Sequence, residues 1–151
     1  MRVTIAAVGR VRRGPYAALY QDYAGRLPWA VDLHEIDVRK ADPTQQSRRE
    51  GERLLAAMPD GAFIVALDAG GRMLDSQDLA DRIASWRDQG RRDVAFAIGG
   101  ADGLHQAVRA RADLVLSLGP MTWPHLLARV MLVEQLYRAA SILSGHPYHR
   151  G

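Results

Sequence analysis

Five short apolar runs, separated by stretches with helical periodicity, constrain what this chain can fold into. The runs lie at residues 3–8, 31–38, 62–67, 94–98 and 114–118. Four of them are continuously apolar, as expected for strands that are covered on both faces of a parallel sheet. The run at 31–38 alternates apolar and polar residues instead, which predicts a half-exposed strand at an edge of the sheet.

The stretches between these runs predict helices, at residues 15–27, 44–58, 76–89, 104–112 and 125–143. Ser76 is expected to cap the third of these helices, and Gly90 to end it. Alternating strands and helices predict an α/β fold, a mostly parallel sheet with helices on both faces. No repeat, low-complexity segment or linker interrupts the pattern, so residues 1–151 are expected to form a single domain.

Composition excludes several classes of function. The chain has no cysteine, which rules out disulfides, thiolate metal sites and cysteine nucleophiles. No apolar run approaches the roughly 20 residues of a membrane span, and the N-terminus lacks a signal-peptide pattern. We therefore expect a cytoplasmic protein without membrane association. The histidines match no standard metal-ligand spacing and lack carboxylate partners, so no bound metal is expected.

The formal net charge is +3, and Lys40 is the only lysine among 20 basic side chains. Arginine presents a planar fork that suits phosphate oxygens and stacks on bases, so nucleic acid is a candidate partner. GC-rich coding is the alternative explanation for so arginine-rich a chain. Arg10, Arg12 and Arg13 follow the first expected strand, where they could contact phosphate groups.

Glycine-rich loops are expected after several of the strands, at residues 68–71, 99–103 and 119–124. They fall at the edge where open α/β sheets bind ligands. In the segment Ile98–Leu104, two glycines would let a small molecule lie against bare backbone. The alternative is a tight turn that places Asp102 near the N-terminus of the next helix. The segment 9–14 has half of a P-loop pattern, but Pro15 and Tyr16 replace the required Lys and Ser/Thr, which excludes nucleoside-triphosphate hydrolysis.

The expected helix 125–143 is apolar almost all round, which predicts burial on more than one side. A small domain rarely provides such cover alone, so a homodimer interface is expected there. Arg129 falls near the middle of the apolar face. Either its side chain snorkels to solvent, or its guanidinium points inward, at a ligand site or across the dimer.

The histidines differ in their surroundings. His125 begins the last helix, whose positive N-terminal potential should keep its imidazole neutral. His34 and His105 have no functional neighbours in the sequence and are interpreted as incidental. The tail His146-Pro-Tyr-His-Arg150 either frays, as chain ends often do, or folds onto a substrate pocket, as its stiff, aromatic composition favours.

Several motifs, in order along the whole chain, resemble the H family of bacterial ribosomal RNA large subunit methyltransferases, a SPOUT-class family. They are Leu67-Asp68, Ile98–Leu104, Met121–His125, Arg129-Val130, Glu134–Arg138 and Tyr148-His149. The resemblance implies methylation of N3 of a pseudouridine in 23S ribosomal RNA, with S-adenosylmethionine as cofactor. It also implies a C-terminal trefoil knot and a homodimer with the tail near the active site.

The resemblance places the cofactor contacts on eight residues: Leu67, Gly99, Leu118, Gly119, Pro120, Met121, Thr122 and Trp123. The pair Gly119-Pro120 departs from the less constrained residues of other members, which puts the backbone contacts there in question.

Methyl transfer to an imide nitrogen requires alignment and removal of a proton, and no metal. Candidates for the base or its orienter are His125, His146 and His149. The candidates for stabilising the developing negative charge are Arg129, Arg138 and Arg150, and the tail adds Tyr148 to this catalytic set.

Arg10, Arg12, Arg13 and Arg150 are the expected RNA contacts. Because the net charge is modest, a pre-formed ribosomal surface is expected as substrate rather than naked RNA. A non-catalytic ribosome- or RNA-binding module is the alternative, and it would need the arginines but not the glycine-rich loops.

Overall fold

In residues 1–39 and 41–150, which the computed structural model describes, five strands form one sheet. Lys40 and Gly151 lie outside the described residues. Every neighbouring pair of strands is parallel, and the order across the sheet is β2-β1-β4-β3-β5. The strands are β1 (Arg2–Val8), β2 (Ala30–Ile36), β3 (Phe63–Met73), β4 (Asp93–Ile98) and β5 (Leu114–Ser117). The predicted α/β fold with a parallel sheet is thus confirmed.

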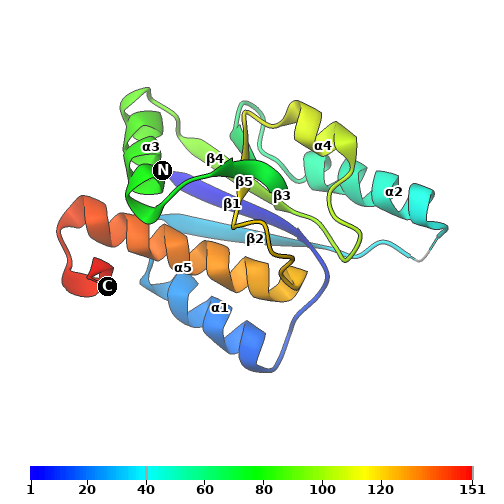
Figure 1. Ribbon diagram of the computed structural model, residues 1–151, viewed down its shortest axis with the longest axis horizontal. Helices are drawn as coiled ribbons and strands as arrows, with labels where there is room; N and C mark the ends of the chain where they lie inside the picture. The colour runs from blue at the N-terminus through cyan, green and yellow to red at the C-terminus, as the bar shows by residue number, and fades with distance from the viewer. Residues whose placement is uncertain (40, 151) are drawn as a thin grey trace.

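Helices cover both faces of the sheet, as Figure 1 shows. Helices α1, α3 and α5 lie on one face, and α2 and α4 lie on the other. Their bounds are α1 (Pro15–Arg26), α2 (Pro43–Ala56), α3 (Ser76–Asp88), α4 (Gln106–Arg111) and α5 (His125–Ser144), followed by a 3-10 turn, η1 (Pro147–His149). Within the described residues, no helix is both long and apolar enough to cross a membrane.

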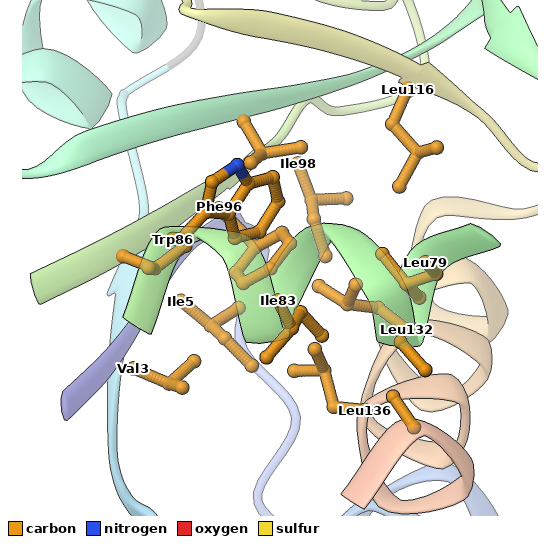
Figure 2. Close-up of a cluster of buried hydrophobic side chains, with 14 of the residues drawn as sticks. Val3, Ile5, Leu79, Ile83, Trp86, Phe96, Ile98, Leu116, Leu132 and Leu136 are labelled. Carbon is orange, nitrogen blue, oxygen red and sulfur yellow. The ribbon is translucent and has the colours of Figure 1, made fainter. Parts of the chain in front are cut away.

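The two faces of the sheet carry side chains of different size, because successive residues of a strand point to opposite faces. On the side of α3 and α5, large side chains fill the core, and Figure 2 shows Ile83 and Trp86 of α3 beside Ile5 and Phe96 of the central strands. On the side of α2 and α4, neighbouring strands present a row of alanines, Ala6, Ala97 and Ala66. Small side chains let those two helices approach the sheet closely.

The alternating run at 31–38 forms β2, which is an edge strand as predicted. Its exposure alternates along the strand until the buried Ile36 at its end. By contrast, β1 is buried from Val3 to Val8 because strands and helices cover it on all sides. The period of the apolar pattern therefore distinguished the edge strand from the covered one.

Of the two predicted details at the ends of α3, one is wrong and one is confirmed. Asp75, not Ser76, caps α3: its carboxylate accepts a hydrogen bond of 2.7 Å from the backbone N–H of Asp78. The Ser76 hydroxyl instead donates to the side chain of Gln135 in α5, 2.7 Å away. Gly90 does end this helix, with a φ of 79° that suits glycine.

The expected loop at 68–71 is part of a longer strand. β3 continues to Met73, and residues 68–71 form a bulge, because both Leu67 and Arg72 lie opposite Leu116 of β5. A side chain on Gly71 would lie 2.7 Å from the carbonyl oxygen of Val115. Glycine is therefore needed where the bulged backbone crosses β5.

Candidate active site

Three segments far apart in the sequence enclose a cavity of about 560 Å³ at the carboxyl edge of the sheet. They are the bulged part of β3, the loop after β4 and the loop between β5 and α5. The cavity brings together seven of the eight expected cofactor residues, namely Leu67, Gly99, Leu118, Gly119, Met121, Thr122 and Trp123. Pro120 does not line it. The glycine-rich loops predicted to gather a ligand do meet here.

The loop after β4 folds on itself at its glycines. A Cβ atom on Gly99 would lie 2.7 Å from the backbone carbonyl of Gly103, so no other residue fits there. The N–H of Gly103 donates to the carbonyl of Gly100 at 3.0 Å, which closes the turn. Asp102 is exposed in this turn, but α4 begins later, at Gln106, with His105 as its cap. The tight turn given as the alternative is therefore present, with Asp102 three residues before the helix cap. His105, interpreted as incidental, has a structural role as that cap.

The loop 118–124 is held by hydrogen bonds to its own backbone and to β3. The Ser117 hydroxyl donates to the carbonyl of Ala69 at 3.0 Å, and the N–H of Gly119 donates to that hydroxyl oxygen at 3.0 Å. The indole N–H of Trp123 donates to the carbonyl of Leu118 at 3.2 Å. Gly119 has a φ of 110°, so a glycine is required at this position.

His125 stands where the cavity meets the end of β1. A Cβ atom on Gly9 would lie 3.1 Å from its Nε2, so the ring lies against the bare backbone of that glycine. Burial, reinforced by the positive charge of Arg129, lowers the pKa of His125, and the carboxylate of Glu50 opposes this only in part. The imidazole is thus favoured in its neutral form, as expected, although burial rather than the helix terminus is the main cause.

Arg129 points inward, and only 3% of its surface is exposed. Its guanidinium pairs with the Glu35 carboxylate at 2.7 Å and donates to the carbonyl of Gly9 at 3.0 Å. The snorkelling alternative is therefore excluded. The guanidinium does not line the 560 Å³ cavity, however; it ties α5 to the ends of β1 and β2, one helical turn from His125.

The tail is packed against α5 rather than frayed. The Tyr148 hydroxyl donates to the Glu134 carboxylate at 3.0 Å, and the Arg138 guanidinium lies 5.0 Å from the centre of the Tyr148 ring. His149 Nδ1 contacts the carbonyl of His146. Burial and the hydrogen bonds of its hydroxyl with Tyr23 and Glu134 raise the pKa of Tyr148, so its hydroxyl stays protonated.

The tail lies at the opposite end of α5 from His125 (Figure 1). A helix of 20 residues is about 30 Å long. Arg138, His146, Tyr148 and His149 are consequently absent from the cavity lining of their own chain. The structure thus separates the expected catalytic residues into two groups, and only His125 borders the cavity.

The expected RNA contacts fall in two places. Arg10, Arg12 and Arg13 are exposed between β1 and α1, at the same edge of the sheet as the cavity, and Arg10 lies 3.5 Å from the Asp37 carboxylate. Arg150 is exposed at the end of the tail. The first group is therefore placed to contact a ligand that enters the cavity.

Much of α5 is covered within its own chain. Within the single chain, residues 125–143 of α5 are all buried or partly buried, because α1, α3 and the sheet surround the helix. Apolar side chains such as Leu126, Leu127 and Met131 stay partly exposed, and the homodimer interface at this helix remains a prediction.

The family model described as "Predicted SPOUT methyltransferase" matches residues 1–149. The chain belongs to the SPOUT methyltransferase family. It is 56% identical over 151 residues to the "Ribosomal RNA large subunit methyltransferase H" of Rhodospirillum centenum, and 55% identical over 152 residues to that of Paramagnetospirillum magneticum. Each alignment covers 99% of both chains.

The fold of this SPOUT family member is also similar to that of a solved structure, a probable methylase family protein from Haemophilus influenzae Rd KW20. The TM-score is 0.60 at 11% identity, and the match covers 99% of this chain and 70% of the other. At this identity the likeness concerns the fold.

Sequence reasoning missed three acidic residues near the site. Glu35 is the partner of Arg129, Asp68 lines the cavity and pairs with Arg109, and Glu50 acts on His125 through its charge. The inward position of Glu35 could have been predicted from the sequence. It lies two residues after Leu33 and four after Val31, so it points to the same, inward face of β2. In the described residues, no group of three or more His, Asp or Glu side chains could hold a metal ion.

Proposed function

We propose that this protein is an S-adenosylmethionine-dependent methyltransferase that modifies N3 of a pseudouridine in 23S ribosomal RNA, on assembled ribosomes. One observation carries the proposal: a single cavity gathers seven of the eight residues expected to contact the cofactor, from three separate segments. Relatives 45–56% identical over the full chain that bear the name of an rRNA large subunit methyltransferase support the substrate class.

The cavity fits such a cofactor in size and in character. Its volume of about 560 Å³ lies within the range of roughly 300–1,000 Å³ that is usual for small-molecule sites. Its wall combines apolar side chains with the bare backbone of three glycines, Gly99, Gly100 and Gly119, which suits an adenosine with polar edges. When bound, S-adenosylmethionine supplies a methyl group on a sulfonium, and its transfer by in-line displacement leaves the uncharged thioether S-adenosylhomocysteine.

Residues of the chain itself position the RNA and remove the proton from the target nitrogen. The target nitrogen must lose its proton, and the neutral imidazole of His125, at the rim of the cavity, is the acceptor we assign. Arg129 is a positioning residue: it fixes the backbone of Gly9, against which the His125 ring rests. Arg10, Arg12 and Arg13 hold the phosphates of the RNA at this edge.

We further propose that the protein acts as a homodimer in the cytoplasm, and that the tail of a second copy completes each site. The support is the place of the tail in its own chain. Tyr148 packs against Glu134 and Arg138 of α5, which lie about 14 Å and about 20 Å along the helix from His125. Neither the tail nor Arg138 lines the cavity of its own chain. A tail that contributes to catalysis must then reach the cavity of another copy. The knot implied by the resemblance forms part of this proposal.

A methyl-transfer assay tests the function. Ribosomes from a strain that lacks this gene are incubated with the protein and S-adenosyl-[methyl-³H]methionine, and label in 23S RNA is located by nuclease mapping. We expect label at one pseudouridine on ribosomes and far less on naked 23S RNA. Ribosome binding without label, together with no cofactor binding by calorimetry, would instead establish the non-catalytic RNA-binding alternative.

Subunit mixing tests the role of the tail. A variant lacking residues 146–151 and a Gly99→Val variant are each expected to be inactive, the first with cofactor binding retained. After subunit exchange, a tail that acts across the dimer restores about a quarter of wild-type activity, because half of the dimers then hold one complete site. No recovery, with exchange verified by mass spectrometry, would show that the tail acts only within its own chain.

A further inference from the structure

The wall of the cofactor cavity is almost free of charged side chains. Of its described lining residues, Asp68 is the one aspartate, and no glutamate, lysine or arginine is among them. The other titratable lining residue is His125, whose lowered pKa keeps it neutral near neutral pH. A ligand in this cavity therefore experiences one negative side chain within the wall.

Asp68 is held in a fixed position at the start of the bulge in β3. Its Oδ2 accepts a hydrogen bond of 3.0 Å from the N–H of Gly70, and its Oδ1 lies 3.3 Å from the guanidinium of Arg109 in α4. The Arg109 side chain is 41% exposed and is not part of the cavity wall, whereas that of Asp68 is 25% exposed. Solvent weakens the Arg109 charge, so it compensates Asp68 only in part.

The charge of Asp68 acts throughout the cavity. A space of about 560 Å³ is on the order of 10 Å across, which is comparable to the Debye length of about 8–10 Å at 0.1–0.15 M salt. A positive group anywhere inside is therefore attracted, without requiring direct contact with the carboxylate.

We infer that Asp68 makes this site prefer the cationic sulfonium cofactor over its uncharged thioether product. The inference rests on the proposed function. In methyl transfer the carbon–sulfur bond breaks, a carbon–nitrogen bond forms, and the proton of the target nitrogen passes to a base. The charge of the ligand in the cavity thus falls by one unit, and its attraction to Asp68 falls with it. Asp68 is a specificity-determining residue that favours exchange of product for fresh cofactor.

Calorimetry on the full-length protein with three ligands tests this inference. The ligands are S-adenosylmethionine, S-adenosylhomocysteine and sinefungin, which carries an ammonium near the position of the sulfonium. We expect Asp68→Asn to weaken binding of the two cationic ligands by three- to tenfold relative to S-adenosylhomocysteine. The asparagine side chain retains an oxygen for the Gly70 N–H, so the bulge should be preserved.

Two further variants serve as matched controls. Arg109→Gln removes the compensating charge and should increase the preference for the cationic ligands. Asp88→Asn removes an exposed carboxylate at the end of α3, on the side of the sheet where β4 begins and away from the cavity, and it should change the ratio of affinities by less than about twofold.

The outcomes separate the inference from the proposed function. If none of the three ligands binds the wild-type protein, the cofactor assignment itself fails. If all three bind and Asp68→Asn weakens them equally, the residue has only a structural role and the inference is overturned. An unchanged ratio in both Asp68→Asn and Arg109→Gln overturns it in the same way.

Discussion

The guanidinium of Arg129 and the carboxylate of Glu35, 94 residues apart in the chain, meet at 2.7 Å over the carboxyl ends of β1 and β2. Each comes from a face that is otherwise apolar: Arg129 from the inner side of α5, and Glu35 from the inner side of the edge strand. The same carboxylate accepts the N–H of Val11 at 2.8 Å. The pair therefore fixes the segment that leaves β1 beside the cavity.

Removing the negative partner should destabilise the fold. Glu35→Gln leaves the buried Arg129 without a counter-charge, and we expect the free energy of unfolding to fall by about 2–4 kcal/mol. Urea denaturation monitored by circular dichroism measures this loss. Asp37→Asn, which disrupts only the exposed pair with Arg10, is the control and should cost less than about 0.5 kcal/mol. Equal losses in both variants would contradict a structural role for the buried pair.

Stability should depend on pH through His125. Its pKa in the folded state is lowered from 6.5, so the unfolded chain binds the proton more readily than the folded one. The contribution to stability is complete above about pH 6.5 and is lost as the pH falls toward the folded pKa. His125→Gln should flatten this part of the stability curve, measured by urea denaturation between pH 5 and pH 8. A wild-type slope retained in the variant would assign the dependence to another group.

Tyr20→Phe should be neutral or stabilising. The Tyr20 hydroxyl is buried near Arg129 and Glu35 and has no hydrogen-bond partner among the described residues. Deleting such a group removes a desolvation cost of about 1 kcal/mol or more. Thermal and urea unfolding measure the change. A loss of more than about 1 kcal/mol would mean that the hydroxyl is hydrogen-bonded in solution.

Alkaline pH offers a second test of Tyr20. Burial, and to a lesser extent the Glu35 charge, raises the pKa of Tyr20 from 10.0 to about 12 despite the nearby Arg129. Below pH 10.0 the phenol is neutral in both states; as the pH rises from 10.0 toward 12 the unfolded chain ionises first, so the stability of the fold is lost over this window. Wild type should therefore lose more stability than Tyr20→Phe over this window, as followed by fluorescence.

Gly71→Ala should disrupt the pairing of β3 with β5. The added methyl group would lie 2.7 Å from the Val115 carbonyl oxygen, a backbone atom that cannot yield without breaking the strand pair. We expect a loss of about 2–4 kcal/mol and weakened cofactor binding, since the bulge carries part of the cavity wall. Gly25→Ala in α1 is the matched control, because nothing lies within 4 Å of its new methyl group. This second change should be neutral or stabilising by up to about 1 kcal/mol.

Local patterns in the sequence predicted the strands and the edge position of β2. A strand covered on both faces is continuously apolar, whereas a half-exposed strand alternates apolar and polar residues. These patterns did not predict that β3 continues through a four-residue bulge, since Asp68 and the glycines around it read as a loop. The crossing with β5 that requires Gly71 is a tertiary contact. Asp75 and Ser76 are adjacent in the sequence. The apolar period does not locate the start of a helix to within one residue, so it could not show which of the two is the cap.

The candidate site was predicted in part for a similar reason. The glycine-rich loops carried their own signal, and they do meet at the cavity. Asp68, Glu35 and Glu50 matter through partners that are distant in the sequence, and charge alone does not identify such partners. The pairing of Arg129 with Glu35 could have been predicted. Each is a charged residue on an otherwise apolar face, and buried charges of opposite sign are expected to pair.

The central position of β4 also bears on how the protein is made. β4 begins at Asp93 and is hydrogen-bonded between β1 and β3. A nascent chain that ends before it can join β1 to β2, but the other edge of β1 remains open. β1 and β3 can be joined only after nearly two-thirds of the chain, up to Ile98 of 151 residues, has left the ribosome, and pairings of such long range form slowly. Translation intermediates of this protein therefore expose strand edges that chaperones must shield from aggregation.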